Sequence, residues 1–274
     1  MFKWNPFAAK QEEAPVQPVA SAAASGDALP TNEALLEAIQ DARLDTLMGD
    51  MRPMHRTLLE AQLFVPLHEA PVEEAGGMRL RYMTFEDDRV MCVFTDKGRM
   101  RDYFLSGGRE EGVHIWFASG QEVCGMATRS ELDKVIINPN SDILYAMPPL
   151  VFRVLAEGWV PGSISDEAIP SGEVIIGKPI SGLPDESMLE IWRDVLKENG
   201  VAEAYWFNAV IPEANELRYA FAIDCAPEQL AKVESDLIGA WLGKWPVNTP
   251  LFVCQLKDDP QSRIIREGGA KIFP

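Results

Sequence analysis

The histidines are the first residues to test for chemistry, because imidazole moves protons near neutral pH and binds zinc. There are only three, His55, His68 and His114. None has the HxxxH or HExxH spacing that would place two imidazoles on one helix face. His114 is flanked by apolar residues on both sides, which is typical of a structural histidine. The histidines therefore predict neither a zinc site nor a general base.

The four cysteines, Cys92, Cys124, Cys225 and Cys254, are far apart in the sequence. Zinc ribbons and thioredoxin-like sites need closely spaced pairs, so neither is predicted. Isolated cysteines usually behave as small buried hydrophobes in a reducing compartment. We expect all four thiols to be buried and reduced, with a disulfide or a redox sensor as the alternative.

Glycine and acidic motifs do not suggest a catalytic or cofactor site either. The glycine pairs at 107–108 and 268–269 form neither GxGxxG nor a P-loop, and no GxSxG is present. The acidic pairs and runs at 73–74, 86–88, 110–111 and 258–259 are expected on exposed turns, because glycosidase and metal chemistry need carboxylates held in a cleft. We predict no catalytic, cofactor-binding or metal-binding residue.

The charge of the chain limits its partners. Its 274 residues include 25 Lys and Arg against 42 Asp and Glu, giving a formal net charge of −17. Nucleic acid and anionic membranes attract clustered cations, and no basic cluster is present, so neither is a predicted partner. The sequence also lacks the apolar core of a signal peptide and any run of about 18 apolar residues. These features predict a cytoplasmic protein.

The first part of the chain predicts a tail followed by a domain. Residues 1–32 are rich in Ala and Pro and are predicted to be a disordered tail. Trp4 and Phe7 at its tip form either a docking motif or an idle terminus. Residues 33–158 predict a mixed α+β domain. The first expected helix starts near Thr31, and further helices are expected at 53–62, 97–105 and 148–156. Strands are expected at 63–67, 78–85, 89–94, 113–117 and 132–137.

The second part predicts a linker over 159–171 and a domain over 172–274. Its expected elements are a strand at 174–176, a helix at 184–198, strands at 201–211 and 217–224, a helix at 226–243 and a strand at 251–256. This order is the ferredoxin-like β-α-β-β-α-β arrangement, so we expect an antiparallel sheet with two helices on one face. Edge contacts are expected from 264–265 and 271–274. The predicted fold class is α+β with two domains.

The tryptophans are interpreted mainly as packing residues. Trp192, Trp206 and Trp241 fall on the apolar faces of the predicted C-terminal elements. Trp159 and Trp245 are expected at a domain junction, with an exposed binding anchor as the alternative.

Several stretches resemble the SseB family, named for enhanced serine sensitivity. They are RTLLEAQLFVPL at 56–67, VFTD at 93–96, IINP at 136–139 and the segment from GEVIIG at 172–177 to the final Phe-Pro. The resemblance covers residues 33–274 and implies a bacterial, cytoplasmic protein with no established catalytic residue or cofactor. Thr95, Asn138 and Pro139 match its motif positions. Their side-chain chemistry indicates strand-end and turn residues, with ligand contact as the alternative.

These observations together predict a protein that is not an enzyme. The first hypothesis is a protein-interaction or adaptor module linked to serine sensitivity, with an unidentified protein partner. The alternative is a sensor of a small amino-acid ligand, because ferredoxin-like domains serve as amino-acid-binding modules and the family name concerns serine. The third hypothesis, an enzyme with an unrecognised site, requires folding to bring a histidine, a cysteine and an acid together in a shielded hollow.

Overall fold

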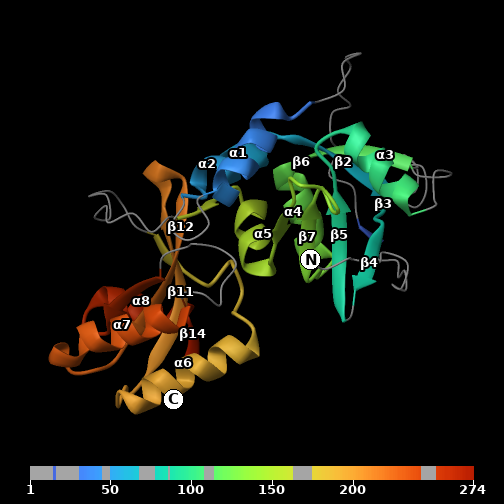
Figure 1. Cartoon of the computed structure of the whole chain (residues 1–274). Helices are drawn as coiled ribbons and strands as arrows, with labels where there is room; N and C mark the ends of the chain where they lie inside the picture. Colours follow the sequence, from blue (N-terminus) through green and yellow to red (C-terminus); the bar gives the residue numbers. More distant parts are fainter. Residues whose placement is uncertain are drawn as a thin grey trace. The chain divides into compact units, whose positions relative to one another are not determined.

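The computed structural model describes residues 15–16, 31–44, 50–67, 78–85, 87–107, 114–162, 175–241 and 251–274 (Figure 1). The chain divides into two compact units: residues 1–44 with 53–158, and residues 45–52 with 159–274. Helices and sheets occur in both units, so the predicted α+β class is confirmed. None of the described helices is long and apolar enough to cross a bilayer.

The first unit is built on a four-stranded sheet. Its strand order is β4 (Tyr82–Phe85), β5 (Asp88–Val93), β7 (Lys134–Ile137) and β8 (Tyr145–Met147). The two central strands, β5 and β7, are parallel, whereas both outer pairs are antiparallel. Parallel neighbours place the ends of both strands at the same edge of the sheet.

A separate pair of strands extends this sheet beyond the end of β5. In it, β2 (Gln62–Leu67) pairs antiparallel with β6 (His114–Ser119). Two backbone hydrogen bonds of 2.8 and 3.0 Å join Phe64 of β2 to Phe94, directly after β5. A short ladder also joins β1 (Pro15–Val16) to β3 (Met78–Arg79), so these two residues of the predicted disordered tail are paired. The remaining tail residues up to 30 lie outside the described part of the chain.

The helices of the first unit follow local signals in the sequence. They are α1 (Glu33–Leu44), α2 (Arg52–Glu60), α3 (Lys97–Ser106), α4 (Gly120–Arg129) and α5 (Pro149–Ala156). Asp96 caps α3 by accepting a hydrogen bond from the Arg99 N–H at 2.9 Å. Ser119 and Glu122 form a capping box at the start of α4, a helix that the sequence analysis missed. α4 packs against the apolar α5.

The second unit has a six-stranded sheet arranged around one hairpin. That hairpin joins β11 (Ala204–Ile211) to β12 (Glu216–Ile223) through the 3-10 turn η1 (Pro212–Ala214). The outer edge of β11 carries β10 (Ile175–Gly177) and β14 (Ala270–Phe273), both antiparallel to it. The outer edge of β12 carries β9 (Val160–Pro161) and β13 (Leu251–Gln255), both parallel to it.

Helices cover both faces of this sheet. On one face, Trp192 of α6 (Glu186–Glu198) stacks on Trp241 of α7 (Leu230–Trp241), with ring centroids 5.3 Å apart, and both contact Trp206 of β11. The short turn η2 (Pro227–Gln229) leads into α7. On the other face, Ile265 of α8 (Pro260–Gly268) packs into a cluster with Tyr205 and Phe207. All eight residues of β11 are therefore buried, as in sheets covered on both sides.

Two detailed predictions for the second unit are wrong. The sheet is not the all-antiparallel sheet expected of a ferredoxin-like domain, because the long crossover through α7 returns the chain parallel to β12. The expected edge contact of 271–274 is confirmed, because β14 pairs with β11, and the residues before it form the helix α8, which was not predicted. The predicted linker is wrong at Val160–Pro161, which pair with β12; Val160 is fully buried. Residues 163–171 of that linker lie outside the described part.

Candidate functional site

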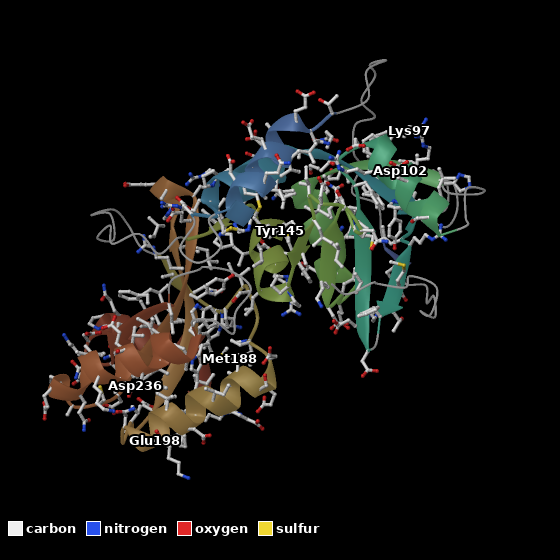
Figure 2. All side chains as sticks on the ribbon, viewed as in Figure 1. Lys97, Asp102, Tyr145, Met188, Glu198 and Asp236 are labelled. Atoms are coloured by element: carbon white, nitrogen blue, oxygen red, sulfur yellow. The ribbon has the colours of Figure 1, made fainter. Side chains whose placement is uncertain are left out.

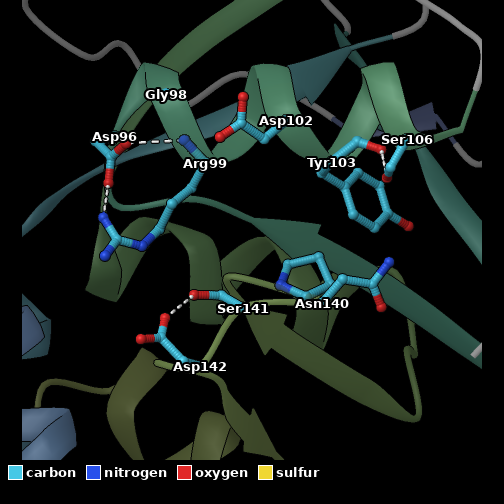
Figure 3. A pocket seen from close by; sticks show the side chains of 10 residues that line it. Asp96, Gly98, Arg99, Asp102, Tyr103, Ser106, Asn140, Ser141 and Asp142 are labelled. Atoms are coloured by element: carbon cyan, nitrogen blue, oxygen red, sulfur yellow. Dashed lines mark hydrogen bonds and ion pairs between the residues drawn. The ribbon is translucent and has the colours of Figure 1, made fainter. Parts of the chain in front are cut away.

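A cavity of about 590 Å³ lies in the first unit between α3 and the loop after β7 (Figure 3). Its lining comes from two stretches of sequence, between Asp96 and Ser106 and between Pro139 and Asp142. These stretches leave the carboxyl ends of the parallel strands β5 and β7. Ligands of α/β sheets typically bind in crevices outside the carboxyl ends of their strands. The cavity is therefore the candidate functional site among the described residues.

Two buried polar residues hold the strand ends together beneath this cavity. The Oδ1 of Asn138 accepts a hydrogen bond from the Thr95 N–H at 2.9 Å, and the Nδ2 of Asn138 donates to the Thr95 Oγ1 at 3.0 Å. The Asn138 N–H donates to Val93 O at 2.9 Å. Thr95 and Asn138 are both fully buried, and Asn138 has a left-handed backbone with φ 53°. Asparagine tolerates this conformation better than most residues, so this Thr95–Asn138 junction fixes where both loops begin.

The α3 side of the cavity carries an ion pair. The guanidinium of Arg99 contacts the carboxylate of Asp96, which also caps the helix and accepts a hydrogen bond from Thr95 Oγ1 at 3.1 Å. Partial burial opposes ionisation of Asp96. The hydrogen bonds from Arg99 and Thr95 and the positive charge of Arg99 outweigh it and hold the pKa of Asp96 below its usual value.

The opposite wall is polar and carries further charge. Ser141 Oγ donates to Asp142 Oδ1 at 3.1 Å and accepts from the Ile143 N–H at 3.1 Å. Asp102, on α3, and Asp142 are exposed. The lining thus combines three carboxylates with one guanidinium. Such a wall can bind an ammonium group on one side and a carboxylate on the other, but it contains neither histidine nor cysteine.

The histidines, for which no chemistry was predicted, lie outside the lining of the cavity. His55 is fully buried, with its Nε2 2.8 Å from Tyr145 Oη, while His114 is exposed on β6 and His68 lies outside the described residues. Burial, and then the neighbouring Cys124 thiol, raise the pKa of Tyr145. Neither His55 nor Tyr145 lines the cavity, and Figure 2 shows Tyr145 apart from Asp102 of its α3 wall. No group of three or more His, Cys, Asp or Glu that could hold a metal ion gathers in the described part of the chain.

The cysteines are free thiols with little thiolate character. Cys92 and Cys124 are buried as expected, but Cys225 and Cys254 are only partly buried, so that prediction is wrong for two of the four. Burial raises the pKa of Cys92 to about 12 and that of Cys254 to about 11. Burial, with help from Asp224 and Glu228, also raises the pKa of Cys225. Since the thiolate is the nucleophile, these environments disfavour cysteine chemistry.

The other singled-out residues have structural places. Trp192, Trp206 and Trp241 form the predicted aromatic core, Trp159 is partly exposed and Trp245 lies outside the described residues. Asp259 caps α8. Gly107 and Gly269 are the C-caps of α3 and α8. The acidic pairs at 73–74 and 110–111 fall outside the described residues.

A second, shallower hollow of about 510 Å³ lies in the second unit beside β14. It carries two cations, Arg193 and Lys271. Arg193 already pairs with Glu186 and donates from Nε to the Ile272 carbonyl at 3.1 Å. Lys271 lies 3.7 Å from Glu203. Because its described lining has no Asp or Glu, this hollow does not offer the opposite side-chain charges that line the cavity of the first unit.

The cavity was not predicted as a site, although its motifs were noticed. Thr95 and Asn138 were interpreted as turn residues, and the structure assigns them the role of supports; Pro139, beside them, is buried and contributes to the lining. The available signal was that polar residues come directly after both strands, in VFTD and in IINP. It could have been used only if β5 and β7 had been known to be parallel neighbours.

Comparison with known proteins gives one match. Residues 33–151 match the family model described as the SseB protein N-terminal domain. No curated protein and no solved structure matches the chain. The matched segment contains both walls of the cavity and the Thr95–Asn138 junction beneath it.

Proposed function

We propose, from the premise that this chain carries an SseB N-terminal domain, that the protein acts by binding and that the cavity of its first unit takes a small amino-acid ligand. The observation that carries this proposal is the pairing of opposite charges across one cavity, at the carboxyl ends of two parallel strands. A protein-interaction or adaptor role linked to serine sensitivity is the rival proposal. No described surface favours it over the cavity.

The size and position of the cavity support a small ligand. Ligand pockets commonly enclose about 300–1,000 Å³, and about 590 Å³ falls within that range. The cavity is open and eight of its ten lining residues have polar side chains, which suits a water-soluble ligand of few atoms. Its walls rest on the buried Thr95–Asn138 junction, so the site is preorganised and a ligand need not order them.

The charges of the walls support a zwitterion. The exposed carboxylates of Asp102 and Asp142 can accept hydrogen bonds from an ammonium group. A guanidinium carries five N–H donors, and only Nη1 of Arg99 is engaged by Asp96, so donors remain for a ligand carboxylate. Ser106 and Ser141 supply hydroxyl groups for a polar side chain. These groups fit a free amino acid better than an anion or an apolar molecule.

The same groups support a role without catalysis. A general base needs an accessible basic atom and a pKa near neutrality. Asp96 instead caps a helix and forms an ion pair, and its pKa is lowered. Burial raises the pKa of the Cys124 thiol, and the buried His55 is engaged with Tyr145. We therefore propose a sensor or carrier rather than an enzyme.

The test is a thermal-unfolding screen against a panel of amino acids that includes L-serine. A ligand at about 100 times its Kd adds about 2.7 kcal/mol to the free energy of unfolding, which raises Tm by several degrees. We expect the rise in wild type to be strongly reduced in Asp142→Asn and in Arg99→Gln.

Arg193→Gln is the matched control. Arg193 is also a helical arginine paired with a nearby carboxylate, but it lies in the second unit. We expect this variant to keep the full ligand response. If no amino acid raises the Tm of wild type, the proposal is wrong. If a purified protein partner instead binds wild type and the cavity variants equally well, that result supports the adaptor proposal.

A further inference from the structure

Asn32, at the start of α1, makes an unusual contact for a helix-terminal residue. Its single side-chain amide nitrogen donates to two carbonyls, Gln62 O and Thr95 O, both at 2.7 Å. Its own carbonyl accepts the hydrogen bond from Leu36 N at 3.0 Å that starts the helix. Asn32 has a left-handed backbone, with φ 49°, which asparagine tolerates. One side chain therefore fastens α1 to both β2 and the segment after β5.

Thr95, one of the two acceptors, is also the support of the cavity. Its carbonyl is bound by Asn32, while its N–H and hydroxyl are bound to Asn138. Its hydroxyl also lies 3.1 Å from Asp96 Oδ2 on the cavity wall. A change in the position of Thr95 must therefore move both walls of the cavity, because one wall begins at Asp96 and the other at Asn138, and both are hydrogen-bonded to Thr95.

The rest of α1 is attached by few groups. Among its described side chains, Leu35 and Ile39 are buried, whereas Glu33, Glu37 and Gln40 are exposed. Helices with few buried apolar side chains belong to the least stable parts of a fold and open locally more often than the core. The two hydrogen bonds of Asn32 therefore add to the burial of Leu35 and Ile39 in holding the start of α1 in place.

We propose that α1 is a latch on the cavity, closed by Asn32 and acting through Thr95. When α1 is docked, Thr95 and Asn138 hold the two loops in register and the cavity is ordered. When Asn32 leaves, the Thr95 carbonyl loses its partner and the loop from 138 to 143 loosens, so a ligand binds more weakly. By reciprocity, a ligand in the cavity keeps α1 docked. The ligand part of this inference rests on the proposed function, whereas the link between α1 and the loop does not.

Hydrogen exchange measured by NMR tests the link without any ligand. The amides of Ser141 and Ile143 report on the loop, because they are bonded to Asn138 O and to Ser141 Oγ. Asn32→Gly keeps the left-handed backbone accessible and removes both hydrogen bonds. The loss of one hydrogen bond raises the equilibrium constant for local opening by a factor of about five. We therefore expect the hydrogen-exchange rates of the amides of α1, Ser141 and Ile143 to rise at least about fivefold.

Two further variants separate the latch from general loosening. Asn32→Asp keeps the size of the side chain and its turn preference but replaces the donor by an acceptor, and it should act like Asn32→Gly. Asn215→Gly makes the same change at a left-handed asparagine of the second unit, where φ is 54°, and should leave α1 and the loop unchanged. The proposal is overturned if exchange rises in α1 of both Asn32 variants while Ser141 and Ile143 keep their wild-type rates.

The ligand arm uses L-serine and the same amino-acid panel. We expect the bound amino acid to slow exchange in α1 of wild type, and its Kd to rise at least about fivefold in Asn32→Gly and not in Asn215→Gly. If no amino acid binds wild type, the proposed function fails while the ligand-free rates still decide the latch. If an amino acid binds both proteins equally and leaves α1 unchanged, the latch is overturned and the proposed function stands.

Discussion

A similar polar arrangement occurs in both units, with different surroundings. In the first unit, Asn138 Oδ1 accepts from the Thr95 N–H and Asn138 Nδ2 donates to the Thr95 hydroxyl. In the second unit, Asn208 Oδ1 accepts from the N–H of Ser181 at 3.1 Å and from its hydroxyl at 3.2 Å. All four residues are almost completely buried. Each pair ties a connecting segment to the sheet by satisfying a buried backbone donor.

The two asparagines differ in the course of the chain beyond them. Asn138 ends β7 in a left-handed conformation, and the next residues turn outward to form a wall of the cavity. Asn208 lies inside β11, opposite Tyr219, in a strand covered on both faces. The same device therefore supports an open site in one unit and closes a packed layer in the other. A buried polar pair does not indicate function by itself. The course of the backbone after the pair shows whether it supports an open site or a packed layer.

The largest expected effect is that of Asn138→Ala. The substitution leaves the Thr95 N–H buried without its acceptor. It also places alanine in the left-handed region, where its Cβ is sterically unfavourable and no side-chain hydrogen bond offsets that cost. We expect a loss of about 3 kcal/mol in the free energy of unfolding of the first unit. Urea unfolding measures it. Asn138→Gly, which relieves the backbone cost, should lose about 1 kcal/mol less; equal losses would contradict the role of the left-handed backbone.

Asn208→Ala should have a smaller effect, about 2 kcal/mol, because its backbone is extended and Ser181 Oγ keeps a second acceptor at Gly182 O, 3.1 Å away. Fluorescence of the Trp192, Trp206 and Trp241 core reports the unfolding of this unit. The variant should bind the amino-acid ligand with wild-type affinity at a temperature where it is folded. A lost affinity would show that the two junctions are not functionally distinct.

Removing the hydroxyl group of Thr95 or of Ser181 should lower the free energy of unfolding by more similar amounts than removing the side chains of Asn138 and Asn208. Thr95→Val removes one buried hydroxyl without leaving a cavity, and we expect a loss of about 1.5 kcal/mol together with weaker ligand binding. Thr95→Ser should restore both. Ser181→Ala should lose about 1 kcal/mol with no change in binding. Urea unfolding and calorimetric titration of the four proteins decide between these outcomes.

The smallest effect concerns pH. The folded pKa of Asp96 is below its usual value, so its contribution to stability is present above the unfolded pKa of about 3.9 and is lost as the pH falls through the folded pKa. Asp96→Asn keeps a helix cap without the charge. We expect the difference in stability between wild type and Asp96→Asn to be constant above about pH 5 and to shrink below about pH 4. A difference that grows on acidification would contradict the lowered pKa.

Asp259 provides the comparison in the second unit. It caps α8, and the Ser262 N–H and hydroxyl lower its pKa, but no guanidinium of the described residues pairs with it as Arg99 pairs with Asp96. Added salt should therefore weaken the charge effect of Asp96→Asn more than that of Asp259→Asn, because salt screens the attraction between the partly exposed charges of an ion pair. Equal salt dependence would mean that the pair with Arg99 contributes no charge effect at Asp96.

The sequence predicts most elements because their signals are local. Hydrophobic periodicity and caps place α3, α6, β11 and the β11–β12 hairpin within a few residues. The missed helices had capping signals too: Ser119 with Glu122 before α4, and Asp259 with Pro260 before α8. Their apolar stripes are broken by small or charged residues, so periodicity alone does not reveal them.

The cavity could not be predicted in the same way. It exists because β5 and β7 are parallel neighbours, a pairing between segments about 45 residues apart that no local pattern encodes. The contact of Asn32 with Thr95 is equally non-local. VFTD and IINP marked the correct strand ends, but only the fold shows that Thr95 and Asn138 meet there and that Asp96 and Asp142 face one cavity.

An NMR titration of the ¹⁵N-labelled protein with L-serine and the amino-acid panel tests the central claim most directly. For at least one amino acid, saturable shifts should be concentrated in the amides of residues 96–106 and 140–142, with β11 and β12 unaffected, and Asp142→Asn should abolish them. Unchanged spectra across the whole panel, or shifts confined to the second unit, would contradict the assignment of the binding site to the cavity beside α3.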